Sequence, residues 1–82
     1  MFYHIELRKR KLKLLIDNSE IILGGNKKLK IYGTLSCKSG KQMKKENRVF
    51  FDSEKEAIDK GYRPCGHCMK TKYLKWKDGI HL

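Results

Sequence analysis

The sequence predicts an α+β fold, with a small three-stranded (or larger mixed) sheet packed with helices. Short runs of β-branched and aromatic residues between turn residues indicate strands, and stretches with apolar residues at helical spacing indicate helices. The 82 residues suffice for one thin core. Because no repeat, low-complexity segment or linker interrupts the chain, we expect one domain over residues 1–82.

The N-terminal part is expected to form a helix and then a strand. Residues 6–18 carry an approximate apolar stripe that includes Leu12 and Leu15, while basic residues cover the other faces. Residues 20–23 are apolar enough for a short strand. The Gly-Gly-Asn run at 24–26 is typical of a turn, so we expect the strand to end there.

Two further strands are predicted in the middle of the chain. Residues 29–32 alternate apolar and basic side chains, which indicates a strand with one buried face. Residues 33–47 contain glycines, serines and lysines and are expected to form a loop. The Arg-Val-Phe-Phe run at 48–51 is the third predicted strand.

The C-terminal third is expected to hold two helices. Ser53 and Glu56 have the spacing of a capping box, and Gly61 is suited to end that short helix. Apolar residues from Met69 to Trp76 recur at i, i+4 and i+7 and indicate a final helix. We expect Trp76 to pack against the first helix. Phe50, Phe51, Tyr62 and Tyr73 occupy amphipathic positions, so we assign most of them to the core and expect no base-stacking role for them.

The composition is strongly basic, with a net charge of +11 at pH 7. Such a charge favours a polyanionic partner, with nucleic acid ahead of an anionic membrane surface. No apolar run approaches the ~20 residues of a membrane span, so we expect no membrane partner. The protein is also expected to be a monomer. The odd number of cysteines and the absence of a secretory leader predict reduced thiols in a cytoplasm, and we expect a bacterial protein.

The cysteines predict a zinc site. Cys65 and Cys68 are separated by two residues, a spacing that lets both sulfurs reach one tetrahedral ion, and Cys37 lies 28 positions upstream of Cys65. A sulfur-rich ligand set favours one structural Zn²⁺. The fourth ligand is left open by the sequence, and the candidates are His4, His67, His81 or water.

The residues around this motif resemble a known family. Residues 46–51 read Glu-Asn-Arg-Val-Phe-Phe, residues 61–68 read Gly-Tyr-Arg-Pro-Cys-Gly-His-Cys, and Gly33 and Cys37 lie upstream. Over roughly residues 30–69 this pattern is similar to the zinc-binding N-terminal domain of the Ada DNA methyl-phosphotriester repair protein. The resemblance implies a small sheet between helices, around one zinc held by four cysteines, with the first loop cysteine as methyl acceptor.

The chain departs from the family pattern in the loop. Only Cys37 is present where the family has a C-x-x-x-C pair, and Lys41 stands where the second cysteine would fall. Counting back from residues 46–47 instead places Cys37 nearer the second cysteine of the pair. Both alignments stay open, whereas the correspondence of Cys65 and Cys68 follows directly from the motif.

The basic residues near the motif predict contact with the nucleic acid backbone. Between Lys27 and Phe51 there are eight cationic residues and a single acidic one. The resemblance implies that this surface approaches DNA, although a solvated lysine face without a partner is the competing interpretation. The residues expected to touch phosphate are Lys41, Lys44, Lys45, Arg48 and Arg63.

The sequence therefore predicts a non-catalytic zinc module that contacts nucleic acid, with DNA favoured. One alternative is self-methylating repair of DNA phosphotriesters through Cys37, which the resemblance suggests. A second is a zinc module that docks an acidic protein. Conventional hydrolysis has no support, because no catalytic triad order, phosphate-binding glycine loop or H-E-x-x-H motif is present.

Overall fold

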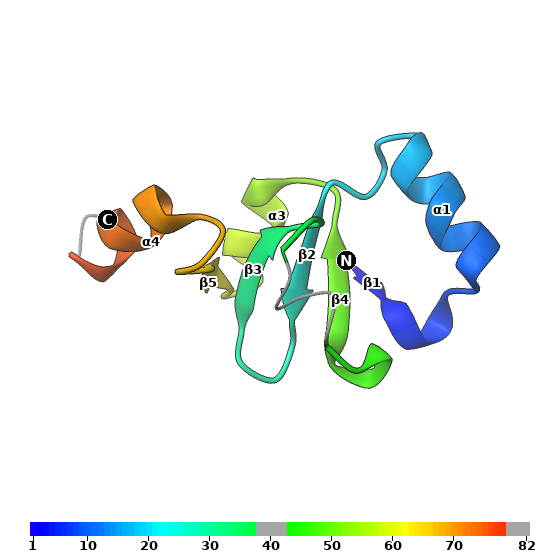
Figure 1. The fold of residues 1–82 in the computed structure, drawn as a ribbon, viewed down its shortest axis with the longest axis horizontal. Helices are drawn as coiled ribbons and strands as arrows, with labels where there is room; N and C mark the ends of the chain where they lie inside the picture. Colours follow the sequence, from blue (N-terminus) through cyan, green and yellow to red (C-terminus); the bar gives the residue numbers. More distant parts are fainter. Residues whose placement is uncertain (38–42, 79–82) are drawn as a thin grey trace.

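Five strands form one sheet in the order β1-β4-β2-β3-β5 (Figure 1). The computed structural model of the protein describes residues 1–37 and 43–78. All neighbouring strands are antiparallel except β3 and β5, which are parallel. The strands are β1 (Phe2–Tyr3), β2 (Leu23–Asn26), β3 (Ile31–Thr34), β4 (Arg48–Phe51) and β5 (Arg63–Pro64). The α+β class is thus confirmed, with a larger mixed sheet than the three-stranded minimum.

The glycine pair expected to form a turn lies inside a strand, so the prediction for residues 24–26 was wrong. Gly25 pairs with Tyr32 on one side and with Val49 on the other. A Cβ on Gly25 would lie 2.9 Å from both the Ile31 carbonyl oxygen and a ring carbon of Phe51. Glycine is needed here for close packing of a central strand rather than for chain reversal.

The turn lies a few residues later and shifts the next strand. The Asn26 side-chain oxygen accepts hydrogen bonds from the backbone N–H groups of Lys28 (2.9 Å) and Leu29 (3.1 Å). Lys30 then takes a positive φ of 58°. An asparagine side chain that accepts from the amides two and three residues further on stabilises a turn by itself. Strand β3 consequently begins at Ile31, two residues after the predicted start.

The helices are close to the predicted ones. They are α1 (Lys9–Asp17), α3 (Glu54–Asp59) and α4 (Lys70–Lys77), with short 3-10 helices at His4–Glu6 and Lys45–Asn47. The Ser53 hydroxyl oxygen accepts from the Glu56 amide at 3.1 Å, and Gly61 has a φ of 85°. Both predicted ends of α3 are therefore confirmed. The first helix is shorter than expected, and the predicted loop 33–47 contains the end of β3 and one 3-10 helix.

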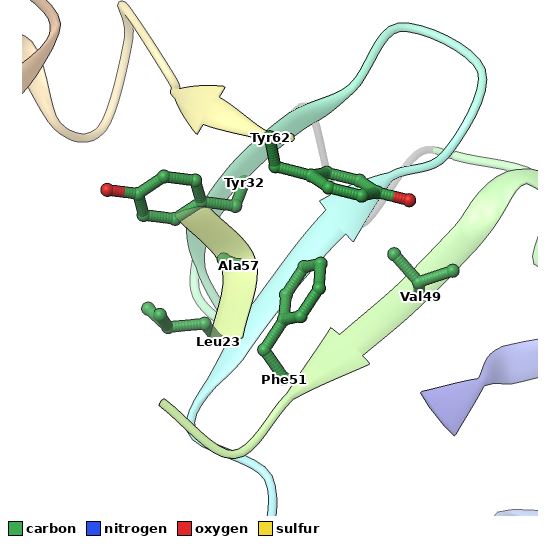
Figure 2. Packing of buried hydrophobic residues seen from close by; sticks show 6 residues of the cluster. All are labelled: Leu23, Tyr32, Val49, Phe51, Ala57 and Tyr62. Carbon is green, nitrogen blue, oxygen red and sulfur yellow. The ribbon is translucent and has the colours of Figure 1, made fainter. Parts of the chain in front are cut away.

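Two clusters of buried residues lie on opposite faces of the sheet, since neighbouring residues of β4 enter different clusters. The first packs α3 against the sheet and is drawn in Figure 2; it consists of Leu23, Tyr32, Val49, Phe51, Ala57 and Tyr62. In the second, Leu15 of α1 packs with Ile21 and Phe50. The core assignment of Phe50, Phe51 and Tyr62 is confirmed.

Helix α4 lies at the end of the molecule opposite α1 (Figure 1). Trp76 stacks on Tyr73 within α4 and lies beside Arg63 of β5, so the expected packing of Trp76 on the first helix was wrong. The parallel pairing of β5 with β3 carries α4 to that far edge. Within residues 1–37 and 43–78, no helix has the length and apolar character needed to cross a bilayer.

Candidate metal centre

The three cysteines lie together at one corner of the sheet. The Sγ atoms of Cys37, Cys65 and Cys68 are all within 4.8 Å of one another. Zn–S bonds of about 2.3 Å in a tetrahedral site place sulfurs about 3.8 Å apart, so small side-chain shifts would let these three sulfurs share one ion. The thiols suit zinc, which prefers sulfur ligands. The cluster fits one structural zinc with an incomplete ligand set.

The sheet positions the cysteines through the β3–β5 pair. The Cys65 amide donates to the Tyr32 carbonyl at 2.8 Å, which extends the ladder by one residue and fixes where the C-x-x-C turn begins. Cys37 follows β3 in a tight turn, in which its amide donates to the Thr34 carbonyl at 3.2 Å. Two segments far apart in sequence therefore converge because adjacent strands carry them.

Backbone amides point at two of the sulfurs. Thr34 N–H donates to Cys68 Sγ and His67 N–H donates to Cys65 Sγ, each at 3.4 Å. Burial raises the pKa of the Cys68 thiol, and the Thr34 hydrogen bond opposes that rise only in part. Zinc would supply the positive charge that holds this sulfur as a thiolate, so metal uptake releases protons.

The fourth ligand is not found in the part of the chain that the structure describes, where no further histidine, cysteine or carboxylate joins the three sulfurs. The His4 ring lies edge-on to Phe50 at 5.2 Å, and its Nδ1 is buried. His67 is exposed, as expected for a residue inside the turn. His81 lies outside the described residues, so His81 and water stay open as fourth ligands.

Gly33 lies at the metal site, although the sequence pointed to it only through the resemblance to the Ada family. A Cβ on Gly33 would lie 2.7 Å from Cys68 Sγ and 3.2 Å from Cys65 Cβ. The backbone of β3 thus forms one wall of the metal site, and any side chain there would occupy the space of a sulfur. Only the tertiary pairing of β3 with β5 makes this constraint visible.

The substitution Gly33→Ala is expected to weaken zinc binding by at least tenfold, because the new methyl group displaces Cys68 from its ligating position. Gly24→Ala is the matched control. Gly24 pairs with Gly33 in the neighbouring strand, yet its Cβ would meet no atom closer than 3.8 Å. Competition with a chromophoric chelator measures both affinities. Equal affinities for the two variants would contradict this role of Gly33.

A cavity of about 430 Å³ adjoins the cysteines, and Cys37, Cys65 and Arg48 are among its lining residues. The Arg48 guanidinium lies 5.0 Å from the Phe50 ring centroid, and its Nε is buried with no hydrogen-bond partner among the described residues. Desolvation lowers the pKa of Arg48, and the negative charge of Cys37 opposes that change. Arg48 thus brings a partly desolvated positive charge beside the metal site.

The residues predicted to touch phosphate do not all lie on one surface. Lys44 and Lys45 are exposed and follow Met43, which lines the cavity beside Cys37. Arg63 does not join them, because it lines a second hollow and donates to the Pro64 carbonyl at 3.0 Å. Lys41 lies outside the described residues.

Comparison with known proteins agrees with this geometry. Residues 18–70, more than half of the chain, match the family described as the metal binding domain of Ada. No curated protein and no solved structure matches the chain. The matched segment contains all three cysteines and runs from the end of α1 to the start of α4. The chain belongs to the family of Ada metal-binding domains.

Proposed function

We propose that this protein is a non-catalytic zinc module whose basic face contacts the backbone of DNA. The observation that carries the proposal is the placement of Arg48 in the wall of the cavity that Cys37 and Cys65 also line. A metal site that fixes a loop fixes the cations of that loop as well. Zinc in this view shapes a surface and takes no part in a reaction.

Three of the proposed cations are available for an anionic partner, namely Arg48 in the cavity wall and the exposed Lys44 and Lys45. In the ranges 1–37 and 43–78, the ion pairs include neither Lys44 nor Lys45 nor Arg48. Phosphate oxygens are the partners that such side chains find on nucleic acid, and these contacts position a protein without reading sequence. Lys41 is proposed to join this set, since it follows Cys37 by four positions.

The charge of the site supports a structural role for the metal. Three thiolates on Zn²⁺ leave a net charge of about −1, against about −2 for four, so each sulfur is a weaker nucleophile. Arg48 next to Cys37 stabilises the thiolate further. Self-methylation at Cys37 is therefore the less favoured function. Because three cysteines that gather to bind a metal must stay reduced, we propose a reducing compartment such as the cytoplasm.

The test is the salt dependence of binding to a short duplex of random sequence. Each neutralised phosphate contributes about −0.9 to the slope of log K against log[salt]. Four such contacts give a slope near −3.6 and a loss of about two orders of magnitude in affinity between 50 and 200 mM salt. Fluorescence anisotropy of a labelled duplex measures the slope. An affinity that does not change over this range would contradict the proposal.

A further inference from the structure

A second hollow, of about 700 Å³, lies between α3, β5 and α4 and shares Leu29 and Tyr32 with the cavity beside Cys37. We call this hollow the aromatic groove. Its lining includes the exposed apolar side chains of Leu29 and Ile58 together with Trp76, which is 39% exposed. Nearly all of α4 lies beyond residue 70, where the family match ends. The side of the groove that α4 supplies, with Lys72, Lys75 and Trp76, therefore lies outside the matched domain, whereas its other lining residues lie inside it.

Two aromatic rings and a guanidinium are stacked at the groove. The rings of Tyr73 and Trp76 have centroids 6.0 Å apart and an interplanar angle of 27°. The Arg63 guanidinium lies 5.1 Å from the Tyr73 centroid and 5.4 Å from the Trp76 centroid. The hydrogen bond from Arg63 to the Pro64 carbonyl ties the guanidinium to β5. The contacts with Tyr73 and Arg63 thus orient the Trp76 indole in the absence of a ligand.

Burial of side chains in the core does not account for the position of α4. Within α4 no residue is buried, and four of its eight residues are lysines. An ion pair between Lys72 and Glu54 ties the helix to α3. Because no residue of α4 is buried, the helix gains little stability from packing against the core, and its apolar side chains Leu74 and Trp76 stay exposed.

The charges around the groove select an anionic ligand. Lys30, Arg63 and Lys75 line it, and Lys30 lies over the Tyr62 ring at 4.9 Å from the centroid. Among the lining residues Glu54 is the one carboxylate, and both Lys72 and the Tyr32 hydroxyl already bond to it. The groove thus combines a flat aromatic surface with cations whose charge is not neutralised by a carboxylate of the groove lining.

We propose that the aromatic groove binds single-stranded nucleic acid, with an unpaired base stacked against Trp76 and phosphates beside Lys30 and Lys75. The inference rests on the proposed contact with DNA and adds a preference for unpaired strands. Single-strand binding sites combine a basic groove with aromatic platforms in this way. An extended acidic peptide fits less well, because edge strand β5 has two residues, one of them a proline without an N–H to donate.

The single tryptophan makes the proposal directly measurable, since Trp76 alone reports indole fluorescence. The probes are a 12-mer of thymidine and an abasic 12-mer with the same phosphates. We expect the thymidine strand to quench Trp76 and to bind at least fivefold more tightly than the abasic strand. Trp76→Ala should remove this advantage, because stacking of a base is worth about 5- to 150-fold in affinity.

Two variants separate stacking from damage to α4. Leu74→Ala removes an exposed apolar side chain of the same helix that does not line the groove, and it should leave the thymidine advantage unchanged. Trp76→Phe keeps an aromatic ring and should retain most of the advantage, measured by anisotropy of the labelled strand. Zinc content and circular dichroism establish that each variant is folded.

Equal binding of both strands without quenching would overturn the groove proposal and leave backbone contact intact. Failure of both strands and of a duplex to bind would overturn the proposed function as well. Quenching by a glutamate-rich peptide, without quenching by thymidine, would assign the groove to an acidic protein and reject single strands. Loss of affinity for both strands to the same degree in Trp76→Ala would also reject stacking.

Discussion

Removal of zinc should lower the melting temperature of this protein by about 15 °C or more. A ligand that binds only the folded state stabilises it by about 4 kcal/mol when its concentration is 1,000 times Kd. In a domain of this size each kcal/mol corresponds to about 4–8 °C. The effect is large here because the two buried clusters are small and neither contains Cys65 or Cys68. Circular dichroism with a chelator, followed by addition of zinc, measures the shift.

The cysteine variants should reproduce the effect of the chelator. Cys65→Ser is expected to lose zinc and to melt at the temperature of the chelated protein. His67→Ala is the matched control in the same turn, because the His67 side chain is exposed and only its backbone N–H contacts a sulfur. A melting temperature that stays constant after complete, verified removal of zinc would show that the packed core suffices and would contradict this expectation.

Neutralising Arg48 and the two exposed lysines shortly before it should abolish tight binding to DNA. In the triple variant Lys44→Gln, Lys45→Gln and Arg48→Gln, three phosphate contacts are lost. The slope of log K against log[salt] should become less steep by about 2.7, since each contact contributes about 0.9. Affinity should fall by at least two orders of magnitude at 50 mM salt, because nearly all non-specific affinity comes from these contacts.

A control variant that loses two positive charges elsewhere tests whether the position of the three cations matters for binding. Lys55 and Lys60 line a different hollow on α3, and Lys55 pairs with Asp59 at 3.5 Å. Lys55→Gln with Lys60→Gln should change the slope by less than one. If both variants weakened binding in proportion to the charge removed, net charge alone would account for the affinity and the placement beside the metal would have no special role.

Local sequence rules located several parts of the fold because their physics acts over a few residues. The strand 48–51 and both ends of α3 follow from β-branched and aromatic residues, a serine cap and a glycine in the left-handed region. The same rules misplaced the strand expected at 20–23. Gly24 and Gly25 resemble a turn in the sequence, whereas pairing with β3 and β4 places both in a strand. The close approach of Ile31 and Phe51 leaves no room for a Cβ at Gly25.

The sequence by itself determined the metal chemistry, because ligand type and C-x-x-C spacing are local properties of Cys65 and Cys68. It also determined the basic character of the protein. The tertiary structure decided which residues share a site. Pairing of β3 with β5 brings Cys37 to the other cysteines, turns Gly33 into a wall of the metal site and separates Arg63 from Arg48. Such juxtapositions depend on strand order and register, and these are fixed by packing between residues far apart in the chain.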